Sequence, residues 1–336
     1  MNGPLVRPRR LRSSPAIRAL VRENTLRAEQ LVLPMFVVEG SGIRDPIKEL
    51  PGVERLSLDL ASERIEEAMR LGVNAFAPFP SIADVDKDPR ASLAVSDDSL
   101  GARTMRHLSE RFPEAILIAD VALDPYSSDG HDGIVDQGRI ANDETVEILS
   151  EMAVVLARNG ATVVAPSDMM DGRVLAIRNA LDESGFTETI IMSYAIKYAS
   201  AFYGPFRAAL DSAPKLRSGV PGDKRTYQMD PAASDEALRE ARLDLEQGAD
   251  IVMVKPGTMY MDVLRRLDSE LDSPLAAFHV SGEFAMLKFA AAGGALEFEA
   301  ALMESVLGLV RAGANVVLTY GAVDIARILK EAVESS

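Results

Sequence analysis

The chain contains no cysteine. It therefore forms no disulfide and offers no thiolate ligand for zinc, which is consistent with a cytoplasmic protein. No apolar run reaches the roughly 18 residues that a membrane-spanning helix requires, so we expect no membrane partner. The N-terminal segment is rich in arginine but has no apolar stretch like that of a signal peptide. Together these absences predict a protein of the cytoplasm.

Basic residues are in the minority. The chain has 36 lysines and arginines and 51 acidic residues, so the formal net charge is −15. Proteins that bind nucleic acid generally present a basic surface, and we therefore expect no nucleic-acid partner. Hydrophobic residues make up 47% of the 336 positions. This is ample for a large core, and the length fits one large domain or two ordinary ones.

Strand-like and helix-like segments alternate about eight times along the chain. Most strand candidates are continuous apolar runs, which is typical of strands buried on both faces of a parallel sheet. They cover residues 31–37, 73–79, 115–121, 161–166, 189–195, 250–255, 275–280 and 314–320. Amphipathic stretches lie between them, among them residues 62–71, 143–158, 235–247 and 297–311. Eight such units predict a (β/α)8 TIM barrel.

A doubly wound open sheet is the competing fold. No Gly-x-Gly-x-x-Gly loop follows the first strand candidate, which disfavours a dinucleotide-binding sheet. Four helix-to-strand junctions share a glycine that suits a helix C-cap, at Gly72, Gly160, Gly248 and Gly313. We predict an N-terminal arm over residues 1–30 and a catalytic barrel over 31–336. Residues from about 210 to 226 combine Ser, Pro, Gly and charges without a clear period, and we predict that they form a lid.

Lys255 ends one of the predicted strands, directly before Pro256 and Gly257. A lysine at the rim of a sheet beside apolar walls is desolvated, which lowers its pKa and frees the lone pair of the amine. A neutral amine in a pocket is what Schiff-base chemistry with a ketone or an aldehyde requires. The competing interpretation is a lysine that caps the strand and points into water.

Lys197 follows another strand candidate in the same way. If both lysines share one pocket, each ammonium group lowers the pKa of the other. In a barrel the chemistry sits where the strands end, at the C-terminal face. The polar and ionisable residues at the predicted strand ends are Asp120, Asp124, Ser167, Asp168, Lys197, Lys255, Ser281 and Tyr320.

With these residues in view, the chain resembles the porphobilinogen synthase (5-aminolevulinate dehydratase) family over nearly its whole length, from Arg7 to Tyr320. The strongest blocks are residues 120–133, 165–173, 197–207, 226–229, 253–257 and 280–283. The resemblance implies a barrel enzyme, usually a homo-octamer. It condenses two molecules of 5-aminolevulinate to porphobilinogen, with loss of two waters, for tetrapyrrole synthesis.

The resemblance also implies roles for the reactive residues. Lys255 would form a Schiff base with the substrate that supplies the propionate side, and Lys197 would hold the substrate that supplies the acetate side. An iminium acidifies the adjacent carbon, so that a base can remove a proton and a carbon–carbon bond can form. The aspartates would either hold a hard cation or a water, or tune and position the substrate amine. They are Asp120, Asp124, Asp132 and Asp168.

Each substrate carries a carboxylate that needs hydrogen-bond donors. By resemblance, Ser281 and Tyr320 bind the carboxylate of the first substrate. Arg207, Lys224 and Gln228 bind that of the second, with Lys224 carried by the lid and Arg207 suited to a bidentate contact. The competing interpretations are ordinary polar residues at strand ends and, for Lys224, a solvated loop charge.

Family members that use catalytic zinc hold it with three cysteines, and this chain has Ala122, Asp124 and Asp132 at those positions. A zinc-thiolate site is therefore excluded. The chain resembles the aspartate-rich branch, whose members use magnesium or need no metal at the active site. Asp132 and Asp168 are candidate ligands of an active-site cation. Dense carboxylates also favour charged lysines, which opposes the lowering of their pKa.

Glu240 matches the ligand of a second, allosteric magnesium ion that lies at a subunit interface in some family members. The competing interpretation is a solvated glutamate on the helix predicted over residues 235–247. His131 is the histidine nearest the reactive residues, and we favour a structural or hydrogen-bonding role for it. His107 and His279 are expected to be packing residues.

The chain departs from the family pattern at Phe284, where tyrosine is common, and at Gly321, where an aromatic residue is common. The lid is also a few residues longer than usual. Two other functions remain open at this point. One is a class I aldolase-type barrel enzyme, which needs a single essential lysine, and the other is a non-catalytic scaffold relative, which would gain nothing from a reactive amine.

Overall fold

Eight parallel strands close into a barrel in the structure, a computed structural model that describes residues 6–334. The predicted positions 1–5 of the arm and 335–336 of the barrel lie outside the described residues. The barrel strands are β1 (Leu31–Val38), β4 (Ala75–Pro80), β5 (Ile116–Val121), β8 (Val163–Pro166), β9 (Ile190–Lys197), β10 (Ile251–Lys255), β11 (Leu275–His279) and β12 (Val316–Thr319). They pair in this order, and β12 returns to β1, where Leu31 lies opposite Val317.

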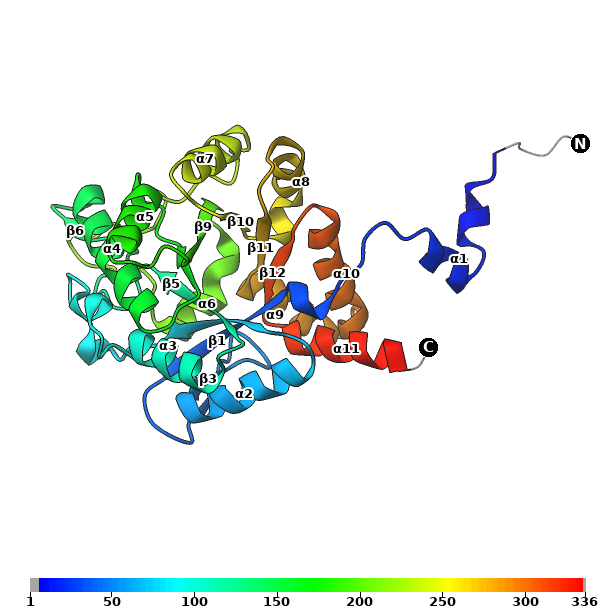
Figure 1. The fold of residues 1–336 in the computed structure, drawn as a ribbon, viewed down its shortest axis with the longest axis horizontal. Helices are drawn as coiled ribbons and strands as arrows, with labels where there is room; N and C mark the ends of the chain where they lie inside the picture. The colour runs from blue at the N-terminus through cyan, green and yellow to red at the C-terminus, as the bar shows by residue number, and fades with distance from the viewer. Residues whose placement is uncertain (1–5, 335–336) are drawn as a thin grey trace, which may run out of the picture.

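Helices ring the barrel on its outside (Figure 1). They are α2 (Leu58–Arg70), α3 (Leu100–Arg111), α4 (Asn142–Arg158), α5 (Arg173–Glu183), α7 (Asp235–Glu246), α8 (Met261–Glu270), α10 (Phe298–Arg311) and α11 (Ala322–Glu334). All eight strand candidates are strands, and the predicted TIM barrel is confirmed over the doubly wound sheet. The continuous apolar runs have the expected cause, because almost every residue of β1, β4 and β8 is buried.

The four glycines at the helix-to-strand junctions end their helices with the same backbone geometry. Gly72, Gly160, Gly248 and Gly313 all have left-handed backbone, with φ between 91° and 118°. At each junction the next residue donates its N–H back to a carbonyl in the last turn of the helix, as Ala161 does to Leu156 at 3.1 Å. This closes a Schellman motif. At Gly160 a side chain would also collide with Ser109, so only glycine turns the chain into β8.

Four further strands were not predicted: β2 (Arg44–Pro46), β3 (Glu54–Ser57), β6 (Val135–Asp136) and β7 (Arg139–Ile140). They have two to four residues each and carry charged side chains, so they lack the apolar run that marks a strand in the sequence. β3 pairs in parallel with the end of β1, where Phe36 lies opposite Arg55. This pairing brings β3 to the rim of the barrel mouth.

The N-terminal arm contains η1 (Pro8–Arg12), α1 (Pro15–Leu20) and η2 (Ala28–Gln30). Proline begins α1, and the Ser14 side chain accepts the N–H of Ile17 at 3.2 Å, as an N-cap does. Figure 1 shows α1 well away from the barrel. No residue of η1 or α1 is buried, and Leu20 is 83% exposed.

Two helices lie close to the C-terminal ends of the strands. α6 (Gly204–Leu210) follows β9 through η5 (Ala201–Tyr203), and α9 (Ser281–Ala292) follows β11 directly. α9 packs on α6 and also on η5, so closely that a side chain at Gly282 in α9 would overlap the backbone of Phe202 in η5. The lid was predicted from about residue 210 to 226; Leu210 is the last residue of α6, and residues 211–226 form neither helix nor strand. Within residues 6–334 no helix is both long and apolar enough to cross a membrane.

Candidate active site

Lys197 and Lys255 are direct partners in the ladder between β9 and β10. Neighbouring strands lie about 4.8 Å apart, and partner residues point to the same side of the sheet. Both lysines are buried, at 5% and 6% exposure, and both line one cavity at the C-terminal face. The cavity is lined by Asp120, Asp124, Asp132, Ser167, Lys197, Tyr203, Phe206, Arg207, Lys224, Gln228 and Lys255.

Aromatic rings surround the amine of Lys255. Its Nζ lies 4.7 Å from the ring centre of Tyr194, 4.8 Å from Phe278, 5.2 Å from Phe206 and 5.4 Å from Tyr203. Burial and the neighbouring ammonium of Lys197 lower the pKa of Lys255 to about 7, against the opposing pull of nearby carboxylates. Burial thus lowers the pKa of Lys255 by more than the carboxylates raise it, and much of the amine is uncharged at neutral pH.

Lys197 lies in a more polar setting. Its Nζ donates a hydrogen bond to the backbone carbonyl of Ser167 at the end of β8, and Asp132 Oδ2 lies 3.8 Å away. The two amines therefore share one cavity but differ in surroundings. One faces aromatic rings, and the other faces oxygen atoms.

Three aspartates at the end of β5 and in the following loop line the cavity, and they differ in charge state. Burial and the proximity of Asp124 raise the pKa of Asp120 to about 6, and its Oδ1 has no hydrogen-bond partner among the described residues. Burial also raises the pKa of Asp124. Burial acts to raise the pKa of Asp132 too, but the ammonium groups of Lys197 and Lys224 hold it well below its usual range. With this pKa and an unpartnered oxygen atom, Asp120 is placed to exchange a proton near neutral pH.

Lys224 reaches the cavity from the lid and is buried. Its Nζ lies 3.2 Å from Asp124 Oδ2 and 3.3 Å from Asp132 Oδ1. Burial acts to lower the pKa of Lys224, but these two carboxylates raise it, so the side chain is charged. It is thus not the solvated loop charge of the competing interpretation.

The aspartates do not fit an active-site cation in this arrangement. Among residues 6–334 no group of three or more metal-ligating side chains is placed to hold a metal ion. Asp124 and Asp132 are paired with Lys224, and an ammonium group in that position competes with a cation. Asp168 is fully buried, and its Oδ2 lies 3.6 Å from Arg173 Nε. Burial raises the pKa of Asp168 to about 7, which further weakens it as a ligand.

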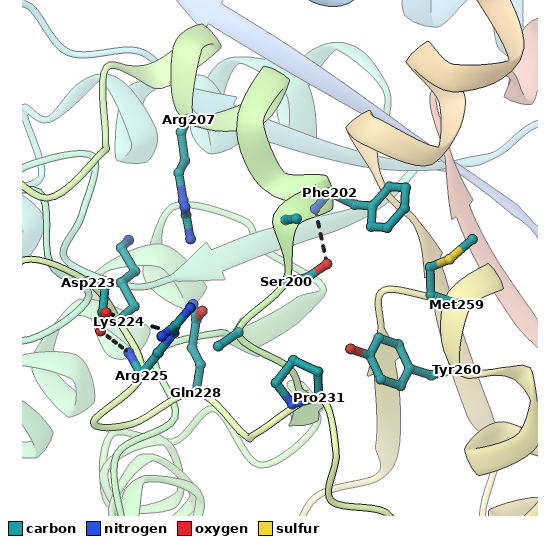
Figure 2. A pocket seen from close by; sticks show the side chains of 12 residues that line it. Ser200, Phe202, Arg207, Asp223, Lys224, Arg225, Gln228, Pro231, Met259 and Tyr260 are labelled. Atoms are coloured by element: carbon teal, nitrogen blue, oxygen red, sulfur yellow. Dashed lines mark hydrogen bonds and ion pairs between the residues drawn. The ribbon is translucent and has the colours of Figure 1, made fainter. Parts of the chain in front are cut away.

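The predicted carboxylate-binding side chains converge on the mouth of the cavity. Figure 2 shows Arg207 extending from α6 into an outer cavity of about 600 Å³, towards the segment that carries Lys224 and Gln228. These three residues line both the outer and the inner cavity. Gln228 is buried, and its Oε1 has no partner among the described residues. A carboxylate entering from outside meets these donors before it reaches the lysines.

Ser281 and Tyr320 follow the ends of β11 and β12, and neither residue is part of the lining of the lysine cavity. Ser281 Oγ accepts the backbone N–H of Phe206 at 3.0 Å, so its hydroxyl hydrogen stays available for another acceptor. The hydroxyl of Tyr320 is buried without a partner in the described part of the chain. Both are donors that suit a second carboxylate.

A hydrogen-bonded contact ties the lid to the loop after β5. His131 Nε2 lies 2.9 Å from the carbonyl of Pro221, which can only accept, so Nε2 carries the proton. In the neutral ring Nδ1 then accepts the hydroxyl of Tyr227 at 3.0 Å. Burial lowers the pKa of His131, which favours that neutral form.

Sequence reasoning did not identify the aromatic residues around Lys255 as part of the site. Tyr194 and Phe278 lie inside strands, and Tyr203 and Phe206 lie in the turn and helix after β9. In the sequence, aromatic residues in such elements look like ordinary core. Only the closure of the barrel brings them around one amine.

Glu240 lies outside the lysine cavity. It is partly buried on α7 and lines a separate cavity of about 470 Å³ together with Asp171, Asp230 and Glu236. Burial and the neighbouring carboxylate of Asp244 raise the pKa of Glu240. The cavity is also lined by Arg225, and among residues 6–334 no three carboxylates are placed to hold an ion directly. The cavity therefore suits only a cation that keeps most of its waters.

The chain matches the family model "Delta-aminolevulinic acid dehydratase" over residues 5–328. It is 49% identical over 325 residues to the delta-aminolevulinic acid dehydratase of Bradyrhizobium diazoefficiens, covering 97% of this chain and 91% of the relative. The chloroplastic enzyme of Oryza sativa is 51% identical over 328 residues, covering 96% and 75%.

A solved structure shows the same architecture. The delta-aminolevulinic acid dehydratase (porphobilinogen synthase) of Toxoplasma gondii, in complex with the reaction product porphobilinogen, superposes with a TM-score of 0.94 and 47% identity. The match covers 98% of this chain and 92% of that chain. The barrel with its paired lysines, the family model and these relatives agree, and the chain belongs to the delta-aminolevulinic acid dehydratase family.

Proposed function

We propose that this chain is a porphobilinogen synthase, a hydro-lyase that condenses two molecules of 5-aminolevulinate to porphobilinogen and two waters. The observation that carries the proposal is the ladder pairing of Lys197 and Lys255 inside one cavity. A condensation of two ketones needs a place for each carbonyl. A class I aldolase needs one nucleophilic lysine, and a second lysine would serve it only by lowering the pKa of the first. Here the cavity that holds Lys197 also contains Arg207, Lys224 and Gln228, which are donors for the carboxylate of a second substrate.

The first substrate binds at Lys255. The neutral amine attacks the ketone carbon, water leaves, and an iminium forms. The aromatic residues around Nζ keep bulk water away from this carbon. Ser281 and Tyr320 are donors for the carboxylate at the far end of the substrate. By holding the carboxylate, Ser281 and Tyr320 would orient the first substrate so that its ketone carbon lies at Lys255.

The second substrate binds at Lys197, with its carboxylate held by Arg207, Lys224 and Gln228. Its carbon next to the ketone loses a proton to a base and attacks the iminium carbon at Lys255. Asp120 is the proposed base, because its pKa of about 6 leaves it ionised at neutral pH and its Oδ1 is unpartnered.

Ring closure then frees Lys255, the lysine that is covalently bound in this scheme. The amine of the first substrate displaces the ketone oxygen of the second, which leaves as the second water. The bond between the first substrate and Lys255 breaks as the ring forms, and loss of a proton makes the ring aromatic. One carbon–carbon and one carbon–nitrogen bond join the two substrates, which accounts for both lost oxygens. Asp124 is proposed to position the free substrate amine.

Incubation with 5-aminolevulinate, followed by borohydride and mass measurement, tests the covalent step. We expect a mass increase at Lys255, and a colour reaction of the released product with Ehrlich's reagent. If no adduct forms and no colour develops, the proposed function is wrong. An adduct without colour would instead favour the aldolase-type enzyme.

Magnesium is proposed at Glu240 as a regulatory ion rather than at the lysine cavity. Magnesium keeps several of its waters in protein sites, which fits a single carboxylate at the edge of a roomy acidic cavity. Glu240 would hold the ion, which would supply local positive charge. No chemical step depends on it.

The arm is proposed to mediate self-association into a homo-oligomer, an octamer by the family pattern. It carries exposed apolar side chains, with Leu11 at 56% and Leu20 at 83%, and exposed apolar surface of this kind marks an interface. Light scattering of the full chain and of a variant lacking residues 1–24 tests this, with a smaller particle expected for the variant. The boundaries of the arm and the lid, and a cytoplasmic location, remain predictions.

A further inference from the structure

The C-terminal end of α6 is held by side chains from the opposite rim of the barrel. The last carbonyls of a helix have no partner within the helix. Here Arg55 Nε donates to the carbonyl of Ala209 at 2.6 Å, and Arg55 Nη2 donates to that of Ala208 at 2.9 Å. Ser81 Oγ also donates to Ala209, at 3.3 Å. Arg55 lies on β3 beside the end of β1, and Ser81 directly follows β4. Both residues therefore belong to the side of the barrel mouth opposite β9 and β10, which carry the lysines.

Lys87 completes this set. Its Nζ donates to the carbonyl of Leu210 at 3.3 Å and to that of Asp211 at 3.1 Å. Its side chain is only 1% exposed, and Asp84 is its ion-pair partner at 3.1 Å. A buried ammonium group is costly unless it is well bonded. The two carbonyls are therefore part of what allows the lysine to be buried, and a cation at a helix C-terminus is favourable in itself.

The helix held in this way carries two residues of the active site. Phe206 packs on Phe36 at 5.6 Å and on Phe79 at 5.1 Å between ring centres, and the same ring faces Lys255. Arg207 extends from the helix into the outer cavity (Figure 2). With seven residues, α6 is too short to be stable alone, so its position depends on these outside contacts.

We propose that Arg55, Ser81 and Lys87 form a clamp that positions α6, and through it Arg207, for binding of the second substrate. The clamp also sets the point at which the lid leaves the helix, since Asp211 begins the lid segment. Its three members are positioning residues, because none of them lines the lysine cavity. The part of this inference that concerns substrate rests on the proposed function.

The kinetic test compares Lys87→Met and Arg55→Met with the wild-type full chain. We expect the KM for 5-aminolevulinate to rise about five- to twentyfold, because Arg207 is a binding group, whereas kcat falls less than about threefold. Borohydride trapping at Lys255 persists, since β10 is untouched. Arg55→Lys keeps the charge and is expected to restore part of the lost affinity. The matched control is Asp84→Asn. It removes the 63% exposed ion-pair partner of Lys87, together with that partner's contact to Lys215 of the lid at 3.8 Å, and leaves the carbonyl contacts of Lys87 intact.

A second measurement needs no activity. Arg217 lies in the lid with its side chain 51% exposed, and we expect trypsin to cleave there faster in Lys87→Met than in wild type or Asp84→Asn. Circular dichroism reports the folded fraction of each variant.

The clamp is wrong if KM matches wild type in both methionine variants, or if only kcat falls in proportion to lost folded protein. Faster cleavage with unchanged KM would mean that the three residues hold the point where the lid leaves α6, but that they do not position Arg207 for substrate binding. A raised KM supports that link at any cleavage rate. Failure of wild type to form porphobilinogen would sink the proposed function instead, and the cleavage comparison would still decide whether the clamp holds α6.

Discussion

Lys255 on β10 and Lys197 on β9 are direct ladder partners, so the charge on one amine acts on the other. The ammonium of Lys197 is one of the two causes that lower the pKa of Lys255, the larger being burial among aromatic rings. The pair therefore links the binding of one carbonyl to the reactivity of the amine that captures the other.

Lys197→Met should raise the pKa of Lys255, because it removes a neighbouring positive charge. We expect the pH midpoint of borohydride trapping at Lys255 to move upward by on the order of one unit. The measurement is the adduct mass as a function of pH. The exposed Lys48, replaced in the same way, is the control and should leave the midpoint in place. A midpoint unchanged in Lys197→Met would mean that the two amines do not interact.

Activity should fall on the acid side as the pH drops through about 7. Below this value Lys255 is mostly an ammonium ion without a lone pair, and above it the neutral nucleophile predominates. We expect kcat/KM to lose about tenfold per pH unit between pH 7 and pH 6, and more steeply below pH 6, where the proposed base Asp120 is protonated as well. An acid limb near the value of a free lysine, about 10.4, would show that the aromatic surroundings do not desolvate the amine.

Lys255→Met should abolish both the adduct at that position and product formation, with a loss of roughly 10⁴-fold or more in turnover. Lys197→Met should also abolish porphobilinogen formation, because the second ketone then has no holding group. Product colour and adduct mass are measured on the same samples. Full turnover in Lys197→Met would point to a one-lysine aldolase.

Lys224→Met should raise the KM for 5-aminolevulinate by about 10- to 100-fold, equivalent to about 1.4–2.7 kcal/mol. The variant loses a carboxylate-binding cation and leaves Asp124 and Asp132 without their main partner. Steady-state kinetics measure the effect. Lys215→Met removes a lid lysine that lies outside both cavities and should change KM less than about twofold. Equal effects of the two substitutions would place Lys224 outside substrate binding.

Magnesium should increase activity through Glu240. We expect activity to fall on addition of a chelator and to return with magnesium, and Glu240→Gln should remove this response while leaving trapping at Lys255 intact. Glu246→Gln replaces an exposed glutamate on the same helix and serves as the control. A magnesium response that survives Glu240→Gln would move the ion to another site.

The barrel is readable from the sequence because its signals are local. A parallel strand buried on both faces must be apolar throughout, as β1 and β4 are. The glycines at four helix-to-strand junctions, Gly72, Gly160, Gly248 and Gly313, are likewise visible, because a left-handed residue is needed there. Short polar strands such as β2 and β6 carry no such signal and were missed. The same limit applies to the clamp, whose lysine and arginine are ordinary charges in the sequence.

By itself the sequence determined the eight-unit barrel, the absence of thiolate ligands and the two lysines at strand ends, since each follows from neighbouring residues along the chain. Only the tertiary structure decided that Lys197 and Lys255 are ladder partners, that Lys224 is buried against Asp124, and that four aromatic rings surround one amine. These relations join residues from distant segments. The pKa of an amine depends on distances through space and on burial, which are set when the barrel closes.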